Sequence, residues 1–179
     1  IINIIPTDAS SIITKINKAK KVKLPSKQDC IDICYCSKMK LVAAIASNND
    51  VMFTSNDGKT WAQVSTPSSM ENACMCYSSK SNKIFIVTKT EDNVLISSDG
   101  TSDNFTTSST PTSLDPVDTV VMDNIGDNGV VGILSSTDLV TSSDGGNTWI
   151  QTVLPLQFSI APYTRVCYNE VAKQLVLIG

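Results

Sequence analysis

The chain contains no histidine and a single arginine, Arg165, and these shortages remove several kinds of chemistry. Without histidine there is no imidazole base for a Ser–His–Asp triad, no His-ligated zinc or haem, and no imidazole pH switch. One arginine also restricts planar, two-point recognition of carboxylates. The sequence therefore indicates an architecture more readily than a reaction.

Charge and long apolar runs are scarce as well. Charged residues make up 17% of the chain, the net charge is −3 and the pI is about 4.8, which argues against a nucleic-acid-binding protein. No run of about 18 apolar residues is present, so we expect no transmembrane helix and no membrane insertion. The first residue is Ile rather than Met. We therefore expect a processed product or part of a longer chain.

The lysines are unevenly placed, with eight of the 13 lying between Lys15 and Lys40. Lysines along a strand edge protect that edge from pairing with other chains. The same cluster could instead be a docking patch for an acidic partner or a glycan. The sequence leaves both interpretations open, and the first is the more common.

The six cysteines include two pairs with C-x-C spacing, Cys34/Cys36 and Cys74/Cys76. Four thiolates from two such pairs could hold a metal ion, because residues i and i+2 of a strand share a face. Cysteine is also a small hydrophobic residue that is commonly buried. We favour packing over metal binding, and predict free thiols with neither a metal nor another cofactor.

The composition that remains favours β-structure. Ser and Thr together supply 41 of the 179 residues, and no stretch has a helical period. Three segments resemble one another: Ser55–Trp61, Ser97–Gly100 and Ser142–Trp149. Each contains a Ser-x-Asp-Gly turn, and the aspartates are 42 and 45 residues apart. Such a fixed spacing indicates a structural repeat.

Two further markers keep the same spacing. The triplets Ile33-Cys34-Tyr35, Met75-Cys76-Tyr77, Val120-Val121-Met122 and Val166-Cys167-Tyr168 occupy one phase, and prolines recur at 25, 67, 111 and 155. Each complete repeat reads as four short strands, which is typical of a β-propeller blade. We therefore predict an all-β fold, a single β-propeller domain of about four four-stranded blades. The predicted boundaries are a partial blade 1–25, blades 26–67, 68–111 and 112–155, and a partial blade 156–179.

The Asp turns have a structural logic. The carboxylate can accept hydrogen bonds from nearby backbone N–H groups, the glycine can adopt positive φ, and the following aromatic can cover the turn. We predict a structural role for the residues that form these turns: Ser55, Asp57, Gly58, Trp61, Ser97, Asp99, Gly100, Phe105, Ser142, Asp144, Gly145 and Trp149. The second turn is expected to be looser, because Phe105 follows its aspartate by six residues.

These turns resemble the Asp-box, or BNR, motif S-x-D-x-G-x-T-W of sialidase-like propellers. The longer repeat looks like those of secreted and phage structural proteins. The resemblance implies a propeller whose Asp-boxes lie at the blade periphery, so it carries information on fold and not on activity. A sialidase-like site needs several arginines and a Tyr–Glu pair. With Arg165 alone, no catalytic residue can be transferred to this chain.

The ends of the chain leave two architectures open. Val22–Leu24 matches a fourth strand, Ser11–Lys15 a third and Ile1–Ile5 a second, while Arg165–Tyr168 and Leu175–Ile178 match a first and a second strand. One possibility is a closed four-bladed ring in which both termini share one blade. The other is part of a larger propeller, completed by further sequence or by another chain.

The function that we expect is a non-catalytic propeller module for binding or structure, in a virion or at a cell surface, engaging a glycan or a protein partner. Ligand loops are expected at one mouth of the ring, and their candidate residues are Asn48, Asn49, Asp50, Asp123 and Asp127. One alternative is a fragment of a sialidase-like glycoside hydrolase that uses two carboxylates. Another is an intracellular factor resembling photosystem-assembly propellers, although that family's arginine-rich patch is missing here.

Overall fold

The protein is all-β. The computed structural model describes residues 22–26, 28–47, 51–68, 70, 73–88, 92–111, 114–154 and 165–178. Within them, 14 strands form three four-stranded antiparallel sheets and one two-stranded sheet. In each four-stranded sheet the strands follow one another in chain order, as expected of propeller blades. The described residues contain no helix long and apolar enough to cross a membrane.

Each sheet is formed by consecutive strands of the chain. Blade 1 contains β1 (Cys30–Cys36), β2 (Leu41–Ala46), β3 (Val51–Ser55) and β4 (Ala62–Ser65). Blade 2 contains β5 (Cys74–Ser78), β6 (Lys83–Val87), β7 (Asn93–Ser97) and β8 (Thr106–Ser109). Blade 3 contains β9 (Pro116–Met122), β10 (Val130–Ser135), β11 (Asp138–Ser142) and β12 (Ile150–Val153). The fourth unit is the pair β13 (Arg165–Asn169) and β14 (Gln174–Ile178).

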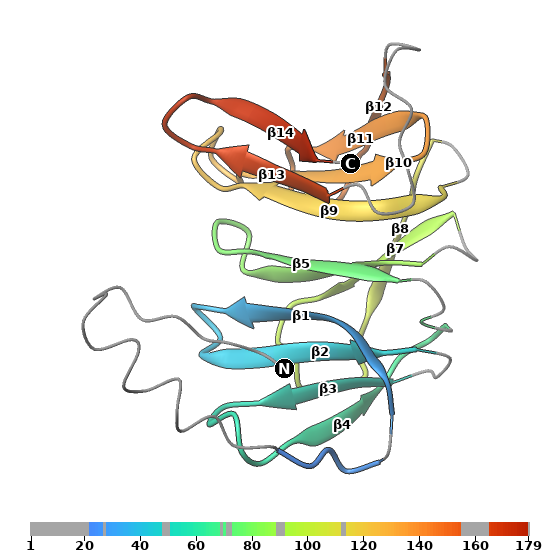
Figure 1. Cartoon of the computed structure of the whole chain (residues 1–179), viewed down its shortest axis with the longest axis vertical. Coiled ribbons are helices and arrows are strands. Elements are labelled where there is room, and N and C mark those ends of the chain that lie inside the picture. The colour runs from blue at the N-terminus through green and yellow to red at the C-terminus, as the bar shows by residue number, and fades with distance from the viewer. Residues whose placement is uncertain are drawn as a thin grey trace.

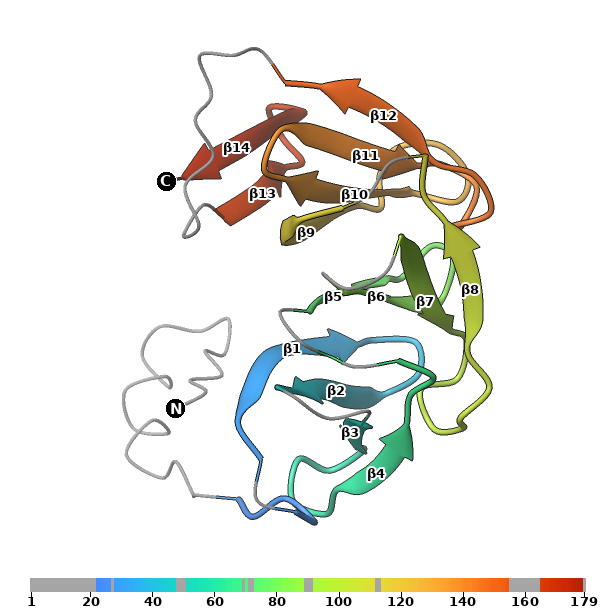
Figure 2. The same cartoon turned by 90° about the vertical axis from the view of Figure 1, so that its right-hand side faces the viewer.

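The four units lie side by side, with the first strand of each unit against the first strand of the next. β1 contacts β5, β5 contacts β9, and β9 contacts β13. Figures 1 and 2 show these units as a curved row with β1 and β13 in its two end units. The described strands do not close into a ring, so the closed four-bladed hypothesis is not realised by them. The open arc fits the other architecture, part of a larger propeller.

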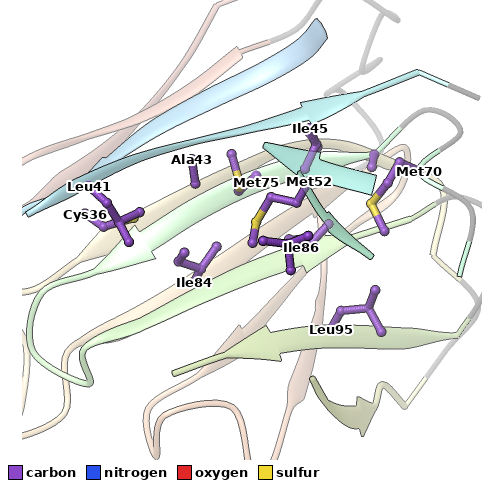
Figure 3. Packing of buried hydrophobic residues seen from close by; sticks show 12 residues of the cluster. Cys36, Leu41, Ala43, Ile45, Met52, Met70, Met75, Ile84, Ile86 and Leu95 are labelled. Carbon is purple, nitrogen blue, oxygen red and sulfur yellow. The ribbon is translucent and has the colours of Figure 1, made fainter. Parts of the chain in front are cut away.

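Three apolar layers fill the spaces between adjacent units. The first layer lies between blades 1 and 2 and includes Ile45, Met52 and Ile86, which are fully buried (Figure 3). The second lies between blades 2 and 3 around Phe85, and the third lies between blade 3 and the β13–β14 pair. Fully burying a side chain of this size contributes about 1.5–3 kcal/mol. The core of the protein is therefore made at the contacts between blades.

Strand pairing corrects the predicted phase of the third repeat. Cys34 pairs with Ala43 across the first hairpin, two residues before its turn, and Val120 holds that place in the third blade. Val120 also faces the next unit, whereas Val121 packs toward blade 2. The equivalent of Cys34 is thus Val120 rather than Val121. The cause is the β9–β10 connection, which has seven residues where the other first hairpins have four.

The N-terminal strand assignments are only partly covered. Residues 22–24 have no strand conformation, so the predicted fourth strand Val22–Leu24 is wrong. A strand needs a partner for its backbone N–H and C=O groups, and no described third strand lies beside this segment. The predicted strands Ser11–Lys15 and Ile1–Ile5 lie outside the described residues.

Candidate functional site

The first Ser-x-Asp-Gly turn joins β3 to β4 and is held by one carboxylate. Asp57 Oδ1 accepts hydrogen bonds from the backbone N–H groups of Lys59 and Thr60, both at 2.7 Å. The hydroxyl of Thr60 donates to Asp57 Oδ2 at 3.3 Å, and that of Ser55 donates to Oδ1 at 3.1 Å. Ser55 Oγ also accepts from the N–H of Gly58 at 2.9 Å. The carboxylate replaces backbone partners that a reversal this tight cannot supply.

The second turn repeats this network, so it is not looser. Asp99 Oδ1 accepts from the N–H groups of Thr101 and Ser102, at 3.0 and 3.1 Å, and Ser97 Oγ accepts from Gly100 at 2.9 Å. Ser102 supplies the hydroxyl that Thr60 provides in blade 1, at 2.7 Å from Asp99 Oδ2. The two extra residues come after the hydrogen-bonded turn, so they do not loosen it.

The third turn contains one extra glycine. Asp144 Oδ1 accepts from the N–H groups of Asn147 and Thr148 at 2.9 Å. Gly145 has the positive φ that we predicted, and the added Gly146 also has positive φ and donates its N–H to Ser142 Oγ at 2.9 Å. The signal for Gly146 was present in the sequence, because the aromatic follows the aspartate by five residues in this repeat and by four in the first.

Hydrogen bonding keeps these aspartates ionised. Backbone donation from Thr60, followed by that from Lys59, lowers the pKa of Asp57 to about 2. For Asp144, partial burial raises the pKa, but hydrogen bonds led by those from Thr148 outweigh it and bring the pKa to about 2. The pKa of Asp99 is lowered mainly by the N–H of Thr101. Such groups are poor proton donors near neutral pH, and their geometry is that of acceptors.

The aromatics that follow the second and third turns contact the preceding blade. Trp149 packs edge-on against Phe85, with ring centroids 6.4 Å apart, and its Nε1–H donates to Ser108 Oγ on β8 at 3.0 Å. Phe105 packs against the layer between blades 1 and 2. Trp61 belongs to the first described blade, and its buried Nε1 has no hydrogen-bond partner among the described residues. The turns therefore link neighbouring blades.

The residues predicted to form ligand loops differ in their surroundings. Asn48, Asn49 and Asp50 lie outside the described residues, and Asp127 is exposed in the β9–β10 connection. Asp123 instead joins blade 3 to the β5–β6 turn. It accepts hydrogen bonds from the Ser78 hydroxyl at 2.7 Å and from the hydroxyl and N–H of Ser79 at 2.6 and 2.8 Å. Burial raises its pKa, but these bonds outweigh that effect and the net pKa is lowered.

Charged groups also gather along the first strands. Asp32 accepts a hydrogen bond from the N–H of Met75 at 2.7 Å, and Asp118 accepts one from Val166 at 2.8 Å. Each bond crosses from one unit to the next. Burial raises the pKa of Asp32 above its usual value, and the charge of Asp118 adds to this while Arg165 opposes it. Sequence reasoning missed this arrangement, because the donors are backbone N–H groups of Met75 and Val166, which lie in other units and have no local sequence signal.

All six cysteines are free thiols in the structure. Cys76 is buried and Cys34 is half-buried, whereas Cys167 is exposed. Burial is the main cause that raises the pKa of Cys76 to about 12, so this thiol is a poor nucleophile. A hydrogen bond with Cys36 raises the pKa of Cys34. Among the residues that the structure describes, no cluster of three Cys, Asp or Glu side chains is suited to a metal ion.

A polar cleft lies where blade 2 meets the third turn. Its volume is about 500 Å³. Its lining is rich in hydroxyl and amide groups and consists of Lys83, Ile96, Ser98, Asn104, Thr106, Thr107, Ser108, Ser109, Gly146 and Asn147. The ammonium of Lys83 donates to the carbonyl of Gly145 at 2.8 Å, which fixes one wall. These groups come from two adjacent blades, so only the folded arc assembles them.

Comparison with known solved structures supports the fold. No protein-family model matches the chain, and no curated protein matches it significantly. Among solved structures, YCF48 from Cyanidioschyzon merolae, a β-propeller protein, superposes with a TM-score of 0.54 at 17% sequence identity. The chain has a β-propeller fold. The match covers 77% of this chain but only 44% of that one, so the chain spans less than half of the YCF48 propeller protein.

Proposed function

We propose that this propeller is a non-catalytic module that binds a glycan in the polar cleft between blades 2 and 3. The observation that carries the proposal is the lining of that cleft, where hydroxyl and amide groups of two blades surround about 500 Å³. Such groups both donate and accept hydrogen bonds, as sugar hydroxyls do. Concave sites with convergent polar groups are the usual form of a ligand site.

The aspartates support a scaffold role. We interpret the three Ser-x-Asp turns as Asp-boxes, because each carboxylate accepts backbone hydrogen bonds from the two residues that close its turn. Asp32, Asp118 and Asp123 accept hydrogen bonds across blade boundaries. Carboxylates engaged in this way organise the backbone. A virion or a cell surface is the setting that we propose, in line with the secreted and phage proteins that these repeats resemble.

The binding experiment uses a glycan array probed with the fluorescently labelled chain. Thr107 lines the cleft, and Thr107→Trp would fill it. Gln151 holds the same position of the outer strand in blade 3, so Gln151→Trp is the matched control. We expect glycan signals that fall at least tenfold in T107W and persist in Q151W. An array without signals, or equal binding by both variants, would contradict the proposal.

A glycoside hydrolase fragment is the second candidate, and one observation favours it. Burial, together with the charge of Asp118, raises the pKa of Asp32, and a raised carboxyl pKa is a property of catalytic acids. Fluorogenic glycosides incubated with the wild type, D32N and D118N distinguish the two functions. Glycan binding on the array without hydrolysis of the fluorogenic glycosides supports the non-catalytic binding module. Turnover that disappears in either variant establishes the hydrolase instead.

A further inference from the structure

The two ends of the arc expose positions that are buried between blades elsewhere. Tyr35 of blade 1 and Tyr77 of blade 2 hold the same position in their hairpins. Tyr77 packs against the first apolar layer, and its hydroxyl accepts a hydrogen bond from the N–H of Lys38 in blade 1 at 3.2 Å. Tyr35 is 63% exposed. Among the described residues, Tyr35 therefore has no counterpart of the interblade contact that Tyr77 makes.

The Ser-x-Asp-Gly turns of blades 1 and 3 differ in the same way: the turn of blade 3 contacts a preceding blade and, among the described residues, that of blade 1 does not. A Cβ placed on Gly146 would lie 2.6 Å from Ile96 and 2.8 Å from Phe85 of the preceding blade, whereas a Cβ on Gly58 would meet nothing within 4 Å. The indole N–H of Trp149 reaches the preceding blade, while that of Trp61 has no partner among the described residues. We define the front face as Tyr35, Gly58 and Trp61. It has the residues of a blade interface, and the described residues include no blade that precedes it.

The opposite end shows the complementary surface. Val176 occupies the place that Phe85 holds in blade 2, and Cys167 the place of Cys76. Phe85 is fully buried under blade 3, whereas Val176 is 39% exposed and Cys167 is exposed too. We define the rear face as Val176 and Cys167. It is the surface on which a following blade would pack.

From these two faces we propose that two copies of this chain associate front to rear and complete one propeller. The front face of one copy would receive the rear face of the other, and the same contact would form a second time across a two-fold axis. Head-to-tail contacts give a closed ring when the rotation returns to its start. The chain spans 44% of the YCF48 propeller protein, so two copies supply close to the material of one such ring.

A second copy is favoured over an unrelated protein because the interface is already present inside the chain. Blades 1 and 2, and blades 2 and 3, meet through the same repeat positions that have no described neighbouring blade at the two end faces. Each copy therefore carries both halves of the contact. Apolar side chains such as Tyr35 and Val176 would be removed from water by it, which drives association. This proposal does not depend on glycan binding in the cleft.

The test is the mass of the full chain in solution, measured by analytical ultracentrifugation with reductant present. We expect twice 19.2 kDa for the wild type. Tyr35→Lys should give a single copy. Ile150 is 65% exposed on β12, away from both end faces, so Ile150→Lys is the matched control and should retain two copies. Far-ultraviolet circular dichroism checks that both variants fold.

A second variant on the other face makes the test independent of any one substitution. Val176→Lys should also give a single copy. Mixing Y35K with V176K pairs one intact front face with one intact rear face, so we expect a one-to-one complex only for front-to-rear association. A wild type that sediments as one copy, an assembly of more than two copies, equal disruption by I150K, or no complex in the mixture would each overturn the proposal.

Discussion

Replacing Gly146 by alanine tests whether the turns lock adjacent blades together. Gly146 has φ of +89°, and a side chain in the left-handed region costs about 1–2 kcal/mol. The new Cβ would also lie 2.6 Å from Ile96 Cδ1 and 2.8 Å from Phe85 Cε1. Ile96 can rotate its terminal methyl, but the fully buried Phe85 ring is held against Trp149. Overpacking of this kind costs about 1–3 kcal/mol.

The expected loss for G146A is therefore about 2–5 kcal/mol, a large share of the roughly 5–15 kcal/mol that holds a domain folded. Gly126 is the matched control, because its φ is +65° and a Cβ there would meet nothing within 4 Å. G126A should lose only the backbone contribution, about 1–2 kcal/mol.

Urea unfolding followed by the fluorescence of Trp61 and Trp149 measures the difference. With a slope of about 2 kcal/mol per M, the midpoint of G146A should fall about 0.5–1.5 M further than that of G126A. The slopes must agree between variants for the comparison to report stability. Equal midpoints would show that the third turn does not insert into blade 2, and the account of blade contacts would then fail.

Three further predictions concern carboxylates and thiols. Asp123→Asn should destabilise the protein by about 1.5–3 kcal/mol in urea unfolding, because hydrogen bonds to a charged group are lost. Asp127→Asn in the same loop is the control and should change stability by less than about 0.5 kcal/mol. Similar losses in both variants would show that the hydrogen bonds of Asp123 to blade 2 do not stabilise the fold. The depressed pKa of Asp144, about 2, means that its stabilisation is present above the unfolded value of roughly 3.9 and disappears as pH falls through 2. Unfolding midpoints of D144N should therefore vary less between pH 4 and pH 2 than those of the wild type, and parallel curves would refute this. Thiol titration of the denatured chain should find six free thiols with or without reductant, and in the native protein the buried Cys74 and Cys76 should react only on unfolding; fewer than six without reductant would reveal a disulfide.

Much of the fold could be predicted because the repeat depends on residues that are close together in the sequence. A turn of Ser, Asp and Gly needs those residues at fixed places, so the sequences of Ser55–Trp61 and Ser142–Trp149 are visibly similar. The strands Val51–Ser55 and Asp138–Ser142 each end at the serine that begins such a turn. The predicted phase of β9 was wrong, because Val120 and not Val121 is the equivalent of Cys34. The longer β9–β10 connection changes the spacing between repeats, and no local residue signals that change.

The contacts between blades could not be predicted in the same way. Asp123 was assigned to a ligand loop, yet both of its carboxylate oxygens accept hydrogen bonds from the neighbouring blade. Its partners are more than 40 residues away in the chain, and nothing in the local sequence selects them. The same is true of Asp32 and Met75, whose hydrogen bond exists only because two first strands lie side by side.

By itself, then, the sequence determined the blade: four short antiparallel strands, a carboxylate-held turn and an aromatic that follows it. These depend on residues close together in the chain, where steric and hydrogen-bonding preferences act directly. Only the tertiary structure decided the open arc, the cleft between blades 2 and 3, and the exposed end faces at Tyr35 and Val176. Those features depend on how far each blade rotates from the last, and that rotation results from the packing of side chains brought together from distant repeats.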